Sequence, residues 1–489
     1  MWLDIGIVLV YLAVLVGMGL RGGRQVKSAG DFTASGGRYG TLVLFASLSA
    51  SFIGGGYSSG NAARAFESGI STTLTLFGFS LSMLLIGRLI VPGVGRFPGA
   101  STTGGVIGAA YGKKARVLSG LFIFLCSAGM VGAQMEAIGL VFHVLLGVPP
   151  LTGVLIGFGI VLIYSTAGGL QSVIAADMVQ FALLAVGMPL LLVMSLIRAG
   201  GVGPVLEAVP DAYFNPFNGT TPAGFFSLFL TMMLGEALAP PYTQRLLIGR
   251  SPRSTARATV LSGLFSIPFF LMTGLIGLSA YALNVTDTAA AAMPTLIQTI
   301  LPVGLRGIVM AAMVSIILSA ADGFLNSAAV GLVCDTLLPL RPGLSDKTQL
   351  FLLRAVNLVT GLAAVAVAFA VPDIFEILVL AYSFWCPLIL VPLAAAFLGV
   401  RSDGRAFRSA LTAGLLSTLL WNYLLHRPFG IDGAVVGTAC NLLVFSLRTR
   451  QFHLRHTAAE GHSSPLYPRR LPSVQYISFR EKGPGANSK

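Results

Sequence analysis

Apolar runs long enough to cross a membrane recur along the whole 489-residue chain. A helix needs about 20 mostly apolar residues to cross a bilayer core of about 30 Å. Because every backbone polar group in hydrocarbon must be bonded within the segment, runs of this length favour helices. We therefore predict an all-α polytopic membrane protein. The thirteen predicted transmembrane helices are 3–20, 41–66, 70–95, 116–146, 150–167, 170–198, 223–248, 255–284, 304–338, 350–371, 373–400, 406–425 and 428–447.

The charges support this class and predict an orientation. Only 10% of the residues are charged, against about 25% in soluble proteins. A net charge of +13 would by itself favour a nucleic-acid partner, but cytoplasmic loops carry most Lys and Arg in membrane proteins. With the N-terminus outside and the C-terminus cytoplasmic, all but four of the 31 basic residues fall on the cytoplasmic side; the exceptions are Arg64, Arg198, Arg306 and Arg427. One cytoplasmic segment in this count, which includes the adjoining span ends, holds Arg245, Arg250, Arg253 and Arg257. We predict a multi-pass protein of the plasma (inner) membrane, in contact with lipid and without a nucleic-acid partner.

Two predicted spans contain residues that break helices. The second span contains Gly54, Gly55 and Gly56, and the seventh contains Pro240 and Pro241. In a helix interior glycine costs about 1 kcal/mol and proline about 3 kcal/mol relative to alanine. Interrupted spans at matching places in two halves of a chain indicate the binding site of a transporter. The alternative is that the glycines only allow close helix packing.

Five spans counted from each break give two repeats of opposite orientation, a LeuT-type 5+5 inverted repeat. The first apolar run has no basic stretch before it and no cleavage site after it, which favours a retained span over a signal peptide. A short helix is expected at 288–301, in an outer loop. The predicted division is 1–40 (first transmembrane helix and cytoplasmic loop), 41–198 (first inverted repeat), 199–222 (extracellular loop), 223–400 (second inverted repeat), 401–447 (two additional transmembrane helices) and 448–489 (basic, disordered cytoplasmic tail).

Five ionisable residues stand out at membrane depth: Arg64, Glu136, Asp177, Glu236 and Asp322. Charged side chains at the bilayer centre cost at least about 2.5–3.5 kcal/mol, so they usually face a cavity or a partner. Ser319 and Asp322 are three residues apart, which places them on one helical face, and a hard cation prefers several oxygen ligands. We predict a cation site that includes Asp177 and Asp322. The alternatives are carboxylates bonded to Ser, Thr or a basic group, and an Arg64 that extends to the interface.

Signatures of catalysis are missing from the sequence. The five histidines form no HExxH pair, and no GxSxG elbow or P-loop occurs. The four cysteines lie singly in apolar runs, which indicates neither a disulfide framework nor a zinc site. We predict no enzymatic activity and no organic cofactor. Because no loop is long enough for a nucleotide-binding domain, transport would use an ion gradient or be passive.

Several motifs carry a family resemblance between about residues 3 and 400. They are LDIGIVLVYLAVLVGMG, GDFTASGGRYG, YSTAGGLQSVIAADMVQ, PPYTQRLL and AAMVSIILSAADGFLNSAAVGLVCD. In this order the chain resembles the sodium:solute symporter family, which includes sodium/glucose, sodium/proline and high-affinity choline transporters. The resemblance implies thirteen spans, alternating access and sodium-coupled symport of a small organic solute.

The resemblance also implies a sodium site. Ser319 falls on a hydroxyl ligand of the family and Asp177 on an aspartate associated with sodium coupling, while Leu44, Ser47 and Ile316 would supply carbonyl oxygens. Ala320 departs from the pattern, because the family commonly has a second hydroxyl there. Asp322 could supply the missing ligand, either for sodium or as a proton site.

A solute pocket is expected at the middle of the membrane. Its predicted lining residues are Ser51, Phe52, Gln134, Glu136, Glu236, Tyr382 and Trp385. The two glutamates would suit a cationic or zwitterionic solute, and the alternative for the aromatic residues is simple helix packing. Phe52 and Ala239 stand where the choline branch has tryptophans, which argues against choline because its binding relies on cation–π contacts.

Three other functions stay open at this point. A proton-coupled symporter of the same fold would use Asp322 as its proton site. A membrane solute sensor would need a signalling domain, and the tail after Arg448 is too short for a kinase. A channel would not need two broken helices around a closed site.

Overall fold

The computed structural model describes residues 2–33, 37–370 and 374–460, and these residues form helices and no strand. The longer helices are α1 (Trp2–Gly23), α3 (Thr41–Phe52), α4 (Asn61–Ser68), α5 (Ser71–Leu85), α7 (Lys113–Leu146), α8 (Pro150–Ala199), α10 (Pro222–Gly235), α11 (Pro240–Leu247), α12 (Pro252–Ala282), α14 (Leu305–Val330), α16 (Asp346–Ala370), α17 (Ile374–Tyr382), α18 (Val391–Leu398), α19 (Gly404–Leu419) and α20 (Gly433–Glu460). The shorter elements used below are α6 (Thr103–Tyr111), α9 (Val202–Ala208), α13 (Ala292–Ile300), α15 (Leu338–Leu340) and the π-helical turns η1 (Gly56–Gly60), η2 (Ile86–Ile90), η6 (Gly331–Leu337), η7 (Cys386–Leu390) and η8 (Leu420–Leu424). The predicted all-α class is confirmed.

By helix length and composition, the described structure contains fewer candidate membrane spans than the thirteen predicted. In the described part of the chain, eight helices are long and apolar enough to span a membrane, or ten if each bent pair counts as one span. Helix α8 counts once, although its 50 residues would extend about 75 Å, more than twice the bilayer core. It kinks at Gly169, where φ is 56° and ψ is −157°, between the two spans predicted at 150–167 and 170–198. Helices α19 and α20 are not among the helices counted here, so the thirteen spans stay a prediction.

Two spans are broken at their middle. Helix α3 ends at Phe52, and the chain bends by 64° before it continues through η1 into α4. The backbone N–H of Gly55, freed by the break, donates to Oε1 of Gln134 on α7 at 2.8 Å. Helices α10 and α11 meet at 42°, and the four residues between them include Leu238 with a φ of 54°. Pro240 and Pro241 open α11, where their missing N–H groups cost no hydrogen bond.

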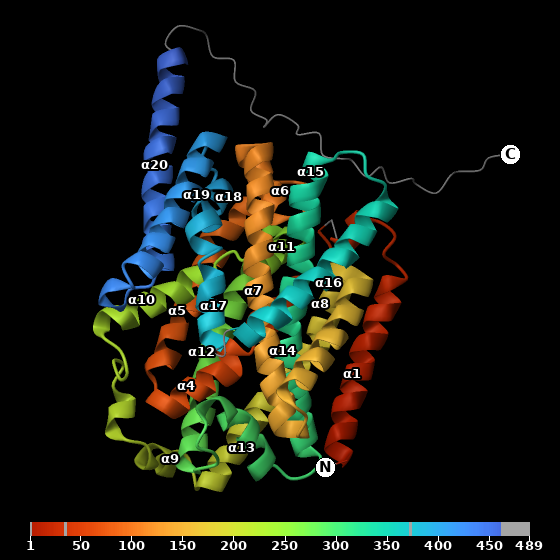
Figure 1. Cartoon of the computed structure of the whole chain (residues 1–489), viewed down its shortest axis with the longest axis vertical. Coiled ribbons are helices and arrows are strands. Elements are labelled where there is room, and N and C mark those ends of the chain that lie inside the picture. Colours follow the sequence, from red (N-terminus) through yellow and green to blue (C-terminus); the bar gives the residue numbers. More distant parts are fainter. Residues whose placement is uncertain (1, 34–36, 371–373, 461–489) are drawn as a thin grey trace, which may run out of the picture.

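The broken spans pack around one central helix. In the segment Leu305–Leu340, which contains α14, 94% of the most apolar 18-residue stretch is buried inside the protein. Helix α14 contacts α8, α7, α1 and α3. Figure 1 shows α14 inside the bundle, with α1 and α8 on one side and α7 and α17 on the other. The central position of α14 brings its polar residues, from Ser315 to Asn326, between the two broken spans.

The two ends of the molecule differ. The helix expected at 288–301 is present as α13 and lies with α9 at the end that holds the N-terminus (Figure 1). Helix α20 ends at the opposite end, beyond the predicted last span, and continues to Glu460. The rest of the predicted tail, 461–489, lies outside the described residues.

The buried carboxylate of Asp4 on α1 binds residues at the start of α14. Asp4 is 1% exposed, and its Oδ1 accepts from the backbone N–H groups of Gly304 at 2.8 Å and Gly307 at 3.1 Å. Its Oδ2 accepts from Nε of Arg306 at 3.0 Å and Nη2 at 2.7 Å. The N-terminus of a helix favours a negative charge, so Asp4 acts as a cap for α14 from another helix.

The first prediction concerns this cap. Asp4→Asn removes the charge that Arg306 and the free N–H groups bind, and hydrogen bonds to charged groups contribute about 1.5–3 kcal/mol. We expect a lower Tm of the purified protein in detergent. The matched control is Asp211→Asn, the same change at an exposed loop position, and equal Tm values for the two variants would contradict the role of Asp4.

Candidate functional site

Three helices meet at the carboxylate of Asp177. This side chain is fully buried on α8. Its Oδ2 accepts from Oγ of Ser47 on α3 at 2.5 Å, and its Oδ1 accepts from Oγ of Ser319 on α14 at 2.7 Å. Three of the residues predicted for a cation site are therefore brought together. Both repeats of the predicted division contribute, because Ser47 and Asp177 lie in one and Ser319 in the other.

Arg245 supplies the positive charge at this carboxylate. Its Nη2 lies 2.8 Å from Oδ2 of Asp177, and its Nε donates to Oγ of Ser47 at 2.8 Å. Its Nη1 donates to the carbonyl oxygen of Pro241 at 3.0 Å. Arg245 was counted with a cytoplasmic segment, at the end of its predicted span. Its side chain is fully buried, because α11 continues the broken span into the core. Arg250, the next basic residue, is exposed.

Asp322, also on α14, binds a different residue of α8. It is fully buried one turn beyond Ser319, and its Oδ2 accepts from the hydroxyl of Tyr164 on α8 at 2.7 Å. Its Oδ1 has no hydrogen-bond partner among the described residues. Nearby, Nε2 of Gln180 donates to the hydroxyl of Tyr11 on α1 at 3.3 Å, while Oε1 of Gln180 is also without a partner. Asp322 and Gln180 therefore leave two acceptor oxygens unused in the interior.

The remaining predicted cation ligands line the same region. Leu44 and Ile316 are fully buried. Ala320 faces the first break, since a Cβ added to Gly54 would lie 3.0 Å from Cβ of Ala320 and 2.8 Å from Oε1 of Gln134. A second hydroxyl at position 320 would point into this break.

A second carboxylate lies in the break between α10 and α11. Glu236 is 2% exposed, and its Oε1 accepts from the hydroxyl of Tyr382 at 2.8 Å. The hydroxyl of Tyr242, on α11, donates to Oε2. The hydroxyl of Tyr57, in η1, lies 3.3 Å from that of Tyr382. Tyr57 and Tyr242 were not among the predicted site residues, although each directly follows the glycines or prolines of a break.

The turn after α17 is held against this break. The indole Nε1 of Trp385 donates to the carbonyl oxygen of Ala237 at 2.9 Å. A Cβ added to Gly235 would lie 2.4 Å from the ring of Tyr382, so only glycine permits this approach. Tyr382 and Trp385, predicted to share a face, both contact the broken segment.

The other predicted pocket residues have different surroundings. The rings of Phe52 and Phe79 lie 4.6 Å apart, centroid to centroid. Oγ of Ser51 is buried without a hydrogen-bond partner among the described residues. Gln134 binds the backbone of the first break, as described above. Glu136 is partly exposed on α7, whereas Glu236 is enclosed.

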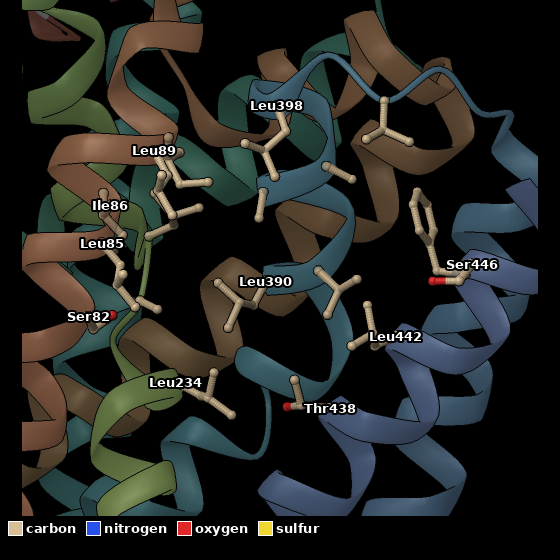
Figure 2. Close-up of a pocket in the computed structure, with 18 of the residues that line it drawn as sticks. Ser82, Leu85, Ile86, Leu89, Leu234, Leu390, Leu398, Thr438, Leu442 and Ser446 are labelled. Carbon is tan, nitrogen blue, oxygen red and sulfur yellow. The ribbon is translucent and has the colours of Figure 1, made fainter.

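An apolar groove lies elsewhere in the described structure. It has a volume of about 990 Å³ and is lined mostly by apolar side chains of α5, η2, α10, α18 and α20. Figure 2 shows Leu85, Leu89, Leu390 and Leu442 pointing into it. None of the buried carboxylates lines it. Its chemistry suits the acyl chain of a membrane lipid, while the polar centre is closed to solvent in this conformation.

Comparison with known proteins identifies the family. The model of the sodium:solute symporter family matches residues 32–401. The chain belongs to the sodium:solute symporter family. The resemblance read from the motifs is thereby confirmed, and the members of this family are transporters rather than enzymes.

Characterised members of the family are distant relatives. High affinity choline transporter 1 of Homo sapiens is 28% identical over 404 residues, which cover 76% of this chain and 68% of that protein. Solute carrier family 5 member 4A of Mus musculus is 26% identical over 402 residues, 71% of this chain and 60% of that protein. The sodium/glucose cotransporter of Vibrio parahaemolyticus is 23% identical over 366 residues, 67% of each chain.

Solved structures agree on the fold. The substrate-bound, outward-open structure of a Na⁺-coupled sialic acid symporter superposes with a TM-score of 0.80 at 18% identity and covers 92% of this chain and 98% of that one. Mhp1, a nucleobase-cation-symport-1 family transporter, superposes in a closed conformation with a TM-score of 0.60 at 12% identity, over 87% of this chain and 95% of that one. The architecture is therefore that of LeuT-fold transporters.

The second prediction tests the buried ion pair. Arg245→Gln leaves Asp177 without its positive partner, and breaking one side of a buried pair costs about 3–5 kcal/mol. The double variant Asp177→Asn/Arg245→Gln removes both charges and should regain a large part of the lost stability. We expect this recovery in detergent unfolding measurements.

The control for this cycle is Arg250→Gln, the same change at an exposed position, which should leave the unfolding midpoint near the wild-type value. Strictly additive losses in the double variant would show that the two charges do not stabilise each other.

Proposed function

We propose that this chain is a sodium-coupled symporter that carries a small organic solute by alternating access. One observation carries the proposal: the two broken spans meet, fully buried, at polar side chains. Ser47 lies on the first half of one broken span, Arg245 on the second half of the other, and both bind Asp177. Family membership supports sodium as the coupling ion.

The balance of charges supports a cation site. Asp177 is neutralised by Arg245, so this pair alone attracts no further ion. Asp322, fully buried and with an unused oxygen, forms no ion pair among the described residues. A monovalent cation between these carboxylates would cancel the remaining negative charge. We assign it carboxylate oxygens, the hydroxyls of Ser47 and Ser319, and the carbonyls of Leu44 and Ile316, as a hard cation requires, with the methyl group of Ala320 beside it.

A proton is the second candidate for the coupling ion. Ala320 removes one oxygen ligand from the family pattern, which weakens a sodium site. A protonated Asp322 would also be neutral, and the Tyr164 hydroxyl could still bind its other oxygen. The same fold would then act as a proton-coupled symporter.

The third prediction separates these two ions. Sodium should raise the Tm of the purified protein above its value in potassium at equal ionic strength, because a ligand of the native state stabilises it by mass action. Asp177→Asn should remove this sodium-dependent increase, whereas Asp211→Asn, at an exposed position, should retain it.

Two results would change the assignment. If Asp177→Asn keeps the wild-type response to sodium, Asp177 is not part of the site. If sodium has no effect, while acidification stabilises the wild type and not Asp322→Asn, the coupling ion is the proton.

The fourth prediction concerns orientation, which we propose to be N-out and C-in. Of the four cysteines, three are buried and Cys440 is partly buried, so Cys440→Ala gives a suitable background. In intact cells an impermeant maleimide should label Asp211→Cys, near α9, and should not label Ser345→Cys, between α15 and α16. Both positions are exposed, so the reverse pattern would invert the orientation.

A further inference from the structure

We infer that the transported solute is a small organic cation and that Glu236 is its counter-ion. The inference rests on the proposed function, because it assigns the solute of that same carrier.

Most buried carboxylates of the described structure have an arginine partner. Asp4 pairs with Arg306 at 2.7 Å, Asp335 with Arg116 at 3.1 Å and Asp177 with Arg245 at 2.8 Å. Asp432 lies 3.9 Å from Arg427. This pattern is expected, because an unpaired charge in the interior costs several kcal/mol.

Two buried carboxylates depart from the pattern, Glu236 and Asp322. Among the described residues no Lys, Arg or His side chain forms an ion pair with either. The proposed coupling ion accounts for Asp322. Glu236 lies in the break between α10 and α11. Its negative charge needs a positive partner from another source.

The hydrogen bonds of Glu236 suit an ionised carboxylate. Oε1 accepts from the hydroxyl of Tyr382, and Oε2 accepts from the hydroxyl of Tyr242. A protonated carboxyl group would use one of its oxygens as a donor. Two tyrosine hydroxyls lower the cost of the negative charge without cancelling it, so an incoming cation would still be attracted.

The aromatic rings nearby suit a cation as well. The ring of Tyr57 lies 5.4 Å from that of Phe79 and 5.3 Å from that of Phe270, between centroids. Tyr57 reaches Glu236 through the hydroxyl of Tyr382. The negative faces of aromatic rings attract ammonium groups, and a carboxylate beside such rings adds a full charge. An anionic solute would be repelled at the same place.

The test compares ligands that differ only in charge. Purified wild-type protein in sodium is titrated with ethanolamine and choline, and with their neutral isosteres propanol and dimethylbutanol, while its Tm is recorded. We expect at least one cation to raise the Tm with increasing concentration and its isostere to have no effect.

Variants test whether Glu236 supplies the negative charge that binds the cation. Glu236→Gln should weaken binding of the cation by about 30-fold or more, as expected when one partner of a buried charge pair is removed, while the stabilisation by sodium remains. The matched control Glu207→Gln makes the same change at an exposed position of α9 and should bind the cation as the wild type does. If Glu236→Gln does not fold, Glu236→Asp keeps the charge and should keep the preference for the cation over its isostere.

The inference is overturned if neither cation stabilises the wild type in sodium, or if cation and isostere bind equally well. It is also overturned if Glu236→Gln binds the cation as tightly as Glu207→Gln. A cation that binds through Glu236 equally well in sodium and in potassium would leave this inference standing and contradict the sodium coupling proposed above. Stabilisation by sodium without any response to ethanolamine or choline would leave the proposed sodium coupling standing and contradict this inference.

Discussion

The buried ion pair of Asp177 and Arg245 is the interaction on which the polar centre depends. Removing two charges from water costs several kcal/mol per ion, and only good geometry with further hydrogen bonds offsets this cost. Both oxygens of Asp177 and three nitrogens of Arg245 are bonded, so the condition is met. Arg245 reaches this position only because the span is interrupted before α11. The ion pair therefore depends on the break.

Features that act locally were predictable from the sequence. Apolar length gave the helical class, and the glycines from Gly54 and the prolines from Pro240 marked the two bends, because these residues disfavour helix wherever they stand. Arg245 was misplaced because the positive-inside rule counts basic residues near span ends, and its depth depends on the direction of α11 after the bend. Tyr57 was missed for a similar reason: Tyr57 and Tyr382 are far apart in the sequence, and only the packing of η1 against α17 brings them together.

The position of Asp322 shows the limit of reasoning from helical spacing. Ser319 and Asp322 were expected on one face, but residues three apart differ by about 60° around a helix axis. In the crowded centre this angle is enough to direct Ser319 to Asp177 on one segment of α8, and Asp322 to Tyr164 on the other. The kink at Gly169 separates these two segments. The same kink explains one of the three spans by which the count by helix length falls short of the apolar pattern, and α19 and α20 account for the other two.

The closed conformation has a consequence for transport. Tyr382 binds Glu236, and Trp385 binds the backbone of the same break, so a solute can reach Glu236 only after the turn after α17 separates from it. The hydrogen bonds lost in opening must be replaced by contacts of the solute or the ion. A ligand shifts such an equilibrium only by the difference between its affinities for the two states. Since the first break contacts Ala320 on α14 and supplies Tyr57 near Glu236, a cation bound beside Ser319 would act on the segment that completes the solute site. Coupling between ion and solute then needs no path other than the three glycines between Ile53 and Tyr57.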